Sequence, residues 1–295
     1  MASSSTRGDG AARKLLQGKL AIVTGSSRGI GAAVICNLAA KGCSVVINYT
    51  SDSSASKAAT LASRLEASYG TVAITVQADM GEPSGPASIV AAAKQHFTDS
   101  TTGSFQIDII VNNAGVVSME WIQDFKVESF RQGYAVNVLG PLLLMQAALP
   151  YLPHDRSGRI VNVSSVSSQL GCASHSIYGG SKAALEAMTR TWARELASRA
   201  TVNAVNPGPV ATDMYAHVPG SEFERMSKPF LLNTPLAEVR PQIDGEDLVR
   251  YAEAAGGRPA YDHEAAGVIC MLCTPDAAWC TGSVVNDNGG MKFCI

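Results

Sequence analysis

Short runs of β-branched and other apolar residues alternate with longer helical patterns along most of the chain. The expected strands cover residues 20–24, 44–48, 71–77, 107–112, 159–164, 201–206 and 283–286. The expected helices between them cover residues 29–41, 54–69, 85–97, 130–152, 177–198 and 265–273. Apolar strands that are separated by crossover helices form a parallel sheet with both faces buried. The alternation therefore predicts an α/β fold with a doubly wound parallel sheet.

A single domain accounts for most of the 295 residues, of which 46% are hydrophobic and 16% are charged. Residues 1–17 are small and polar and lack the apolar core of a signal peptide. We expect a flexible N-terminal extension there, followed by a catalytic domain over residues 18–295. The alternation fails at residues 213–263, a stretch too long for an ordinary connection. We interpret that stretch as a lid over the substrate with one or two short helices.

The overall charge gives no sign of a polyanionic partner. A formal net charge of −2 and a pI near 6.2 do not provide a basic surface for nucleic acid or an anionic membrane, so we expect a small-molecule partner. The seven cysteines are odd in number and lie mostly in apolar stretches, which favours free thiols and a cytoplasmic location. Cys270 and Cys273 have no further metal ligands at a suitable spacing, so we expect helix packing and no metal. The uncharged segment 133–154 contains Asn137 and several prolines, which favours a buried or subunit-facing helix over a membrane span.

A glycine-rich turn, Thr24-Gly-Ser-Ser-Arg-Gly-Ile-Gly31, follows the first expected strand and opens the first expected helix. The free N–H groups and the positive end of a helix attract a diphosphate, and glycines let the backbone approach it closely. The spacing is Gly-x-x-x-Gly-x-Gly rather than Gly-x-Gly-x-x-Gly. The place of this turn between a strand and a helix favours a dinucleotide site over an ordinary turn.

The choice of dinucleotide depends on charge at the end of the second expected strand, where an acid would bind the ribose 2′-hydroxyl and repel a 2′-phosphate. The residues at that place, Asn48, Tyr49, Thr50 and Ser51, are uncharged. Arg28 in the glycine turn can offer a forked cation to a phosphate, and Ser51 can add a hydroxyl group. We therefore expect NADP(H) rather than NAD(H). The alternative is that Arg28 is an ordinary solvated cation of the loop.

Tyr178 and Lys182 are four residues apart in an expected helix, so they share one face of it. A phenol ordinarily titrates near a pKa of ~10, and a neighbouring positive charge stabilises the phenolate and lowers that pKa. Ser164 and Ser165 lie at the end of the expected strand before this helix. The pattern favours acid–base chemistry by Tyr178, with two solvated helix residues as the alternative interpretation.

Together these motifs resemble those of the short-chain dehydrogenase/reductase family, and the resemblance covers residues 18–295. Further matches are Asn112-Asn-Ala-Gly115 and Asn206-Pro-Gly-Pro-Val-Ala-Thr212. The resemblance implies a Rossmann fold with a bound dinucleotide. By position in the motifs, it assigns cofactor contacts to Gly25, Ser27, Arg28, Gly29, Ile30, Gly31, Asn48, Tyr49, Thr50, Ser51, Asp79, Met80, Asn112, Ala114, Gly115, Tyr178, Lys182, Pro207, Gly208, Val210 and Thr212.

The resemblance also implies four catalytic roles. Tyr178 would give a proton to a carbonyl oxygen, or take one in the reverse oxidation, while Lys182 would lower the pKa of Tyr178 and bind the nicotinamide ribose. Ser165 would donate a hydrogen bond to the substrate oxygen. Asn137 would hold a water that links Lys182 to bulk solvent. Adjacent strand residues point to opposite faces, so Ser164 is the alternative to Ser165, and Asn137 could instead satisfy buried backbone groups.

Apolar and aromatic side chains in the expected lid favour a bulky hydrophobic or aromatic substrate. Met214 and Tyr215 belong to this set, and Ser165 and His175 are further expected substrate contacts. The chain resembles fungal polyketide-naphthol reductases and related ketoreductases, which implies a polyketide-type ketone and a place in secondary metabolism. The segments that carry this resemblance are residues 112–118, 177–186 and 212–215.

Three functions fit these residues: NADPH-dependent reduction of a ketone, the same chemistry in the oxidative direction, and non-redox dinucleotide binding. The complete set of four catalytic residues favours redox chemistry, and the preference for NADP(H) favours reduction. The expected helices 130–152 and 177–198 carry more apolar residues than one sheet-facing side needs. We therefore expect a homo-oligomer, a tetramer or a dimer.

Overall fold

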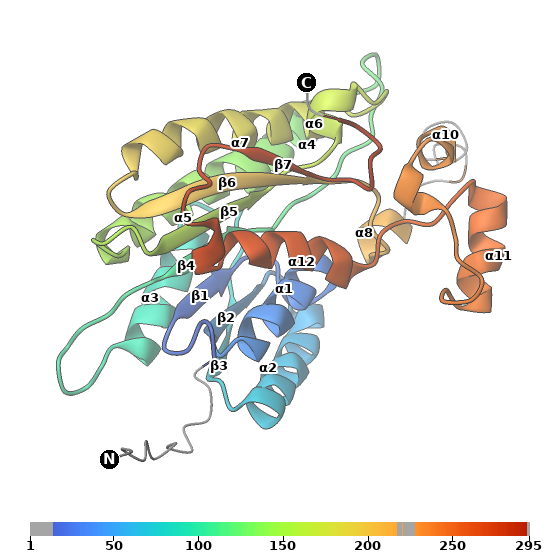
Figure 1. Ribbon diagram of the computed structural model, residues 1–295. Helices are drawn as coiled ribbons and strands as arrows, with labels where there is room; N and C mark the ends of the chain where they lie inside the picture. Colours follow the sequence, from blue (N-terminus) through green and yellow to red (C-terminus); the bar gives the residue numbers. More distant parts are fainter. Residues whose placement is uncertain (1–13, 217–219, 221–227, 294–295) are drawn as a thin grey trace, which may run out of the picture.

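The computed structural model describes residues 14–216, 220 and 228–293, and through this part runs a parallel sheet of seven strands (Figure 1). The strand order is β3-β2-β1-β4-β5-β6-β7, and every neighbouring pair is parallel. The predicted doubly wound fold is confirmed, because the order reverses between β1 and β4. The strands are β1 Leu20–Val23, β2 Ser44–Tyr49, β3 Ala73–Gln77, β4 Ile109–Asn112, β5 Gly158–Val163, β6 Ala200–Pro207 and β7 Val284–Asp287.

Helices cover both faces of the sheet, because each crossover helix buries an apolar stripe against the strands. Alternate strand residues enter opposite cores, so Ala21 packs on one side and Ile22 on the other. The first core lies under α1 Gly29–Ala40, α2 Ala55–Tyr69 and α12 Asp262–Leu272. The second core lies under α3 Gly85–Phe97, α5 Gly140–Ala148 and α7 Ser176–Glu195.

The long helix expected over residues 130–152 is present but is interrupted. It begins as α4 (Val127–Tyr134), passes through a π-helical turn at Ala135–Leu139, continues as α5 and ends in a 3₁₀ turn at Leu149–Tyr151. Within the described residues, Val127–Tyr151 is the one helical run long and apolar enough to cross a bilayer, with 44% of the tested window buried. Length and composition alone do not separate such a run from a core helix, and this one packs against α3 and α7.

One boundary and one short helix differ from the expectation. Leu16 is only 3% exposed and packs in the core with α1 and α2, so the folded domain begins before the expected boundary at residue 18. The rest of the expected extension, residues 1–13, lies outside the described residues. The pattern also missed α6 (Ser167–Leu170), which at four residues is too short to show a helical period.

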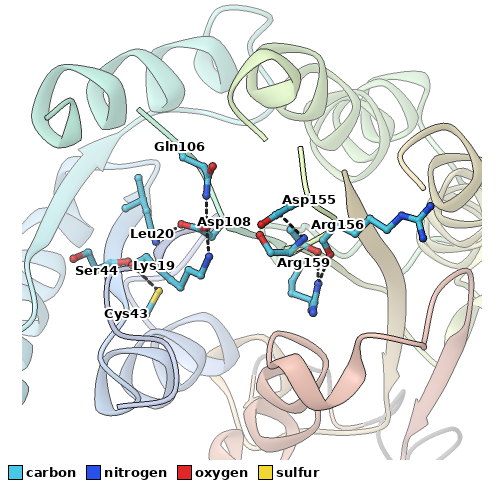
Figure 2. A network of polar contacts seen from close by, with 11 residues as sticks. Lys19, Leu20, Cys43, Ser44, Gln106, Asp108, Asp155, Arg156 and Arg159 are labelled. Atoms are coloured by element: carbon cyan, nitrogen blue, oxygen red, sulfur yellow. Dashed lines mark hydrogen bonds and ion pairs between the residues drawn. The ribbon is translucent and has the colours of Figure 1, made fainter. Parts of the chain in front are cut away.

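A buried carboxylate, Asp108, ties together the amino ends of the central strands (Figure 2). Its oxygens accept from the Leu20 N–H at 2.9 Å, from Lys19 Nζ at 2.9 Å and from Gln106 Nε2 at 2.7 Å. Nearby, the Arg159 guanidinium donates to three backbone carbonyl oxygens. These contacts fix the relative positions of the strands at one edge of the sheet, and the opposite edge carries the cavity described below.

The expected lid, residues 213–263, forms a small helical layer beside the sheet (Figure 1). The expectation of one or two short helices is too low, because the described residues of this stretch form three α-helices and a 3₁₀ turn. The mixture of Pro, Gly and charged residues hides their period. The elements are α8 Asp213–Ala216, α10 Lys228–Leu232, the 3₁₀ turn Pro235–Ala237 and α11 Glu246–Ala255. Their own core consists of Leu231, Ala237 and Ala255.

Candidate active site

A cavity of about 1180 Å³ opens at the carboxyl ends of the strands. This volume exceeds the ~300–1,000 Å³ typical of a pocket for one small ligand, so it has room for a dinucleotide and a substrate. The expected cofactor residues that line it are Gly25, Ser27, Arg28, Gly29, Ile30, Gly31, Tyr49, Thr50, Ser51, Asp79, Met80, Ala114, Gly115, Pro207, Gly208, Val210 and Thr212. The expected catalytic and substrate residues that line it are Ser165, His175, Tyr178, Lys182, Met214 and Tyr215.

Two amide side chains, of which Asn48 is buried and Asn113 is partly buried, hold the glycine turn from beneath. Asn48 is fully buried; its Oδ1 accepts from the Gly25 N–H at 2.9 Å, and its Nδ2 donates to the Ala78 carbonyl at 3.0 Å. Asn113 Nδ2 donates to the carbonyl oxygens of Thr24 and Gly25 at 2.9 and 3.0 Å. The expected cofactor contact at Asn48 is therefore wrong, because its amide is used to shape the turn from the inside.

The turn itself has the form that a diphosphate requires. Gly25 and Gly29 have positive φ angles of 60° and 55°, and a Cβ on Gly31 would lie 2.6 Å from the Gly25 carbonyl oxygen. Helix α1 begins at Gly29, with no side chain capping its first turn and no acidic residue within it. The first N–H groups of α1 and its positive end therefore adjoin the cavity. These residues fit the diphosphate of a dinucleotide.

The far end of this subsite is free of carboxylates from the end of β2. Residues 49–51 line the cavity, whereas Asp52, the next residue, accepts from Gln77 Nε2 at 2.7 Å and is not part of the lining. Arg28 lies opposite with an exposed side chain, and its Nη1 lies 3.2 Å from Asp213 Oδ2 at the start of α8. A cation with neighbouring hydroxyl groups suits a 2′-phosphate better than a free 2′-hydroxyl.

Ser165, Tyr178 and Lys182 meet on one wall of the cavity. Tyr178 and Lys182 are one turn apart on α7, and Lys182 Nζ lies 5.9 Å from the centre of the Tyr178 ring. The Lys182 ammonium donates to the Val163 carbonyl at 2.8 Å, and Ser165, two residues further on, hydrogen-bonds the Tyr178 phenol. Gly115, which follows β4, approaches Lys182 closely: a Cβ on Gly115 would lie 3.2 Å from Lys182 Nζ.

Burial is the main cause of the pKa shifts of Tyr178 and Lys182. It raises the pKa of Tyr178 above its ordinary value, and the hydrogen bond from Ser165 lowers that pKa in part. Burial also lowers the pKa of Lys182 to about 8. Lys182 is not among the causes of the Tyr178 shift, so the expected lowering of the Tyr178 pKa by Lys182 stays a prediction.

Asn137 and Asn112 support the site without lining it. Asn137 exchanges two hydrogen bonds of 2.9 Å with the backbone of Val116, and its Nδ2 also donates to Ser181 Oγ at 3.0 Å. Asn112 Nδ2 donates to Asn162 Oδ1 at 2.7 Å, between β4 and β5. The expected cofactor contact at Asn112 is therefore wrong. The side-chain amide of Asn137 is engaged by the Val116 backbone and Ser181, as the alternative interpretation expects, and its role of holding a water stays a prediction.

The two candidate serines have different partners. Both serines line the cavity, but Ser164 Oγ donates to the buried Glu186 Oε1 at 2.7 Å, whereas Ser165 faces Tyr178. Of the two, Ser165 has the position from which a hydroxyl can reach a substrate oxygen next to the phenol.

Several residues on the substrate side of the cavity could not be found from the sequence. Ser167, Leu170 and Cys172 come from α6 and the turn after it, and Met291 follows β7. Phe230, one of the aromatic residues of the expected lid, lines the cavity from α10. Helix α6 left no periodic signal, and Met291 lies far from any motif. The substrate wall is therefore a mixture of hydroxyl, thioether and aromatic groups rather than a purely aromatic surface.

Comparison with known proteins decides the family. The model of the family described as short chain dehydrogenase matches residues 19–222. The chain belongs to the short-chain dehydrogenase family. This match confirms the family expected from the motifs. Because the members of that family are oxidoreductases, the protein is an oxidoreductase.

Curated relatives of this short-chain dehydrogenase include sugar reductases. An L-xylulose reductase of Aspergillus niger is 52% identical over 94% of this chain and 98% of that protein. An L-xylo-3-hexulose reductase of Hypocrea jecorina is 48% identical over 95% of this chain and 98% of that protein. A versicolorin reductase 1 of Dothistroma septosporum is 33% identical over 93% of this chain and 96% of that protein.

A solved structure shares the whole fold of this short-chain dehydrogenase. The crystal structure of a blue fluorescent protein from a metagenomic library, in complex with NADPH, matches with a TM-score of 0.78 and 31% identity. The match covers 95% of this chain and 100% of that one. The Rossmann-type fold is thereby confirmed.

Proposed function

We propose that this short-chain dehydrogenase reduces a keto sugar, or a similar small polyhydroxylated ketone, with NADPH. The observation that carries the proposal is the meeting of Ser165, Tyr178 and Lys182 on one wall of a cavity whose other end is the glycine turn. The substrate class is supported by the two relatives at 52% and 48% identity, both of which are named for ketoses.

The groups that would hold the cofactor all line the cavity. The N–H groups at the start of α1 would receive the diphosphate, and Arg28, which now pairs with Asp213, would pair with the 2′-phosphate. Lys182, whose ammonium is buried at the carboxyl end of β5, holds the nicotinamide ribose. Bound NADPH supplies the hydride.

The side chains of this chain manage the proton. Ser165 donates a hydrogen bond to the carbonyl oxygen and polarises it, and Tyr178 gives its phenolic proton to the same oxygen as charge develops there. Burial raises the pKa of Tyr178, which keeps the phenol protonated at neutral pH. That is the form required for reduction, so the titration of Tyr178 favours the reductive direction over the oxidative one.

The walls of the cavity bear on the choice between two substrate classes. Ser167, His175 and Tyr215 carry groups that can pair with sugar hydroxyls. Met214 and Phe230 are apolar, and together with the 33% identical versicolorin reductase 1 they favour a second candidate, the polyketide-type aromatic ketone expected from the sequence.

A panel of ketoses and aromatic ketones, followed by the loss of NADPH absorbance, tests both candidates. We expect kcat/KM for L-xylulose to exceed that for any aromatic ketone by ~10-fold or more, with NADPH preferred over NADH. A higher kcat/KM for an aromatic ketone would select the second candidate. Tight NADPH binding without turnover of any ketone would refute reduction and favour a non-redox binding protein.

The expected self-association is also part of the proposal. Leu139, Leu142 and Leu149 are large apolar residues that lie exposed on the long helical run beside α7. Association of two copies through these helices would cover them. Light scattering after size exclusion should report a dimer or tetramer, and a monomer at all concentrations would contradict this assembly.

A further inference from the structure

A buried carboxylate, Glu186, lies one turn beyond Lys182 on α7 and takes no part in the chemistry above. It is 5% exposed and sits behind the cavity wall. A buried carboxylate is costly unless hydrogen-bond donors satisfy it, so the donors around Glu186 indicate what it does.

Three side chains donate to Glu186, and all come from one short segment. Ser164 Oγ and Ser168 Oγ lie 2.7 and 2.6 Å from Oε1, and Gln169 Nε2 donates to Oε2 at 3.2 Å. These residues belong to segment 164–169, which follows β5 and contains Ser165. A single carboxylate on α7 therefore holds the chain on both sides of Ser165.

The contacts continue to Ser165 itself. Ser168 Oγ also lies 2.7 Å from the Ser165 carbonyl oxygen, which is the alternative acceptor for its single hydroxyl proton, and Ser165 Oγ accepts from the Ser167 N–H at 3.2 Å. Both the backbone and the hydroxyl of Ser165 are thus positioned by residues of the segment that Glu186 binds.

The orientation of Gln169 is fixed from its other side. Its Oε1 accepts from Lys292 Nζ, so its Nε2 is the group left for Glu186. Lys292 follows Met291, which lines the cavity. The chain of hydrogen bonds therefore links α7, segment 164–169 and the segment after β7.

We propose that Glu186 is a positioning residue, which holds segment 164–169 against α7 and so sets Ser165 at hydrogen-bonding distance from Tyr178. Ser165 and Tyr178 lie on different elements, and the connection through Glu186 is a direct side-chain link between those elements. The proposal rests on the proposed reductase function. A misplacement of about 1 Å at a reacting group can cost on the order of 100-fold in rate, which makes such a link consequential.

The test compares Glu186→Ala with Glu186→Gln, and Glu195→Gln, an exposed acid on the same helix, is the matched control. The rate is expressed per NADPH-binding site, so that loss of folded protein does not count. We expect kcat to fall on the order of 100-fold in Glu186→Ala with the NADPH Kd changed by no more than about twofold. Glu186→Gln keeps an oxygen for the two serines and should recover to within ~10-fold of the unchanged protein. Glu195→Gln should match the unchanged protein.

The pH profile separates positioning from a general structural effect. The hydrogen bond from Ser165 lowers the pKa of Tyr178, so a displaced Ser165 lets that pKa rise. Reduction needs the protonated phenol and is lost as pH rises through its pKa. The alkaline limb of kcat should therefore move to higher pH in Glu186→Ala and stay in place in the control.

Hydrogen exchange tests the anchoring without any substrate. We expect the backbone amides of segment 164–169 to exchange faster in Glu186→Ala than in Glu195→Gln. Unchanged exchange, or a full kcat with an unmoved alkaline limb, would overturn the role of Glu186. Absence of turnover in the unchanged protein would instead refute the proposed function, while the exchange result would still decide the anchoring.

Discussion

The glycine turn and the lid border the same cavity but are held in different ways. Beneath the turn, the buried amide of Asn48 and the partly buried amide of Asn113 bind backbone groups directly. Among its described residues, the lid has a core of three small or medium side chains, and Leu232, Leu236 and Ile243 on it are 65%, 70% and 71% exposed. The cofactor side is therefore fixed by backbone geometry, whereas the substrate side depends on a few side chains that can change without loss of the sheet.

The lid is nevertheless anchored at both ends. At its start, the Thr212 methyl group lies against Gly29, where a Cβ would be 3.2 Å away, and Asp213 pairs with Arg28. At its end, Arg258 binds Glu264 through two hydrogen bonds of 2.7 and 2.9 Å. The comparison thus predicts strong effects for changes on the cofactor and catalytic side and weak effects for changes at the exposed residues within 232–245 of the lid.

The largest effect should come from the catalytic wall. Tyr178→Phe removes the proton that reaches the carbonyl oxygen and leaves the glycine turn untouched. We expect kcat for ketone reduction to fall on the order of 10³-fold, while the NADPH Kd from fluorescence titration stays close to that of the unchanged protein. Residual full activity with weakened NADPH binding would contradict the role given to Tyr178.

A pH-dependent effect on stability should follow from Lys182. Its pKa of about 8 in the folded protein is lower than in the unfolded chain, so below pH 8 burial of the charged ammonium opposes folding. This cost is relieved as pH rises from about 8 towards the unfolded pKa of ~10.4.

Lys182→Met removes the titrating group. The variant should therefore gain stability relative to the unchanged protein at pH 7, by up to the order of 3 kcal/mol before the lost hydrogen bond to Val163 is counted. The gain should shrink between pH 8 and 10, as measured by urea unfolding. A difference that does not vary with pH would contradict the buried ammonium.

A pair of glycine substitutions compares the two regions directly. A Cβ on Gly31 would lie 2.6 Å from the Gly25 carbonyl oxygen, whereas a Cβ on Gly245 in the lid would meet no atom within 4 Å. Gly31→Ala should destabilise the protein by ~1–3 kcal/mol and weaken NADPH binding about tenfold. Gly245→Ala should change neither quantity appreciably. Equal losses of stability and of NADPH affinity in the two variants would contradict the difference between the glycine turn and the lid.

The smallest of these effects concerns the choice of dinucleotide. Arg28→Gln removes the cation proposed to bind the 2′-phosphate, so the NADPH Kd should rise by about tenfold, the order expected for a hydrogen bond to a charged group. The NADH Kd should hardly change, because NADH lacks that phosphate. Isothermal titration with both dinucleotides measures the difference, and a parallel loss for both would show that Arg28 acts only on the shape of the turn.

The sequence was sufficient for the sheet, because strands buried on both faces leave continuous apolar runs that few other structures produce. It was also sufficient to place Ser165, Tyr178 and Lys182 near one another, since the end of a strand and one helix face carry them. It was not sufficient for Asn48 and Asn137. An amide in a motif looks the same in the sequence whether it turns towards a ligand or towards buried backbone, and only the packing around it decides.

The link between Glu186 and segment 164–169 could not be predicted for a related reason. Its partners come from a strand end and a four-residue helix, and neither has a hydrophobic period that would predict packing against α7. The lid helices were missed because their few buried residues are spread among Pro, Gly and charged positions. Sequence patterns record burial on regular elements, and these contacts lie between elements.

Transfer of deuterium to L-xylulose from NADPH that carries deuterium at both hydrogen positions of the nicotinamide C4 tests the central claim most directly. If the cavity brings a hydride and the Tyr178 proton to one carbonyl group, mass spectrometry will find one deuterium in the alcohol for each NADPH oxidised, and Tyr178→Phe will bind the cofactor without forming that product. Oxidation of NADPH with no deuterium in any alcohol, from ketoses or from aromatic ketones, would contradict the account.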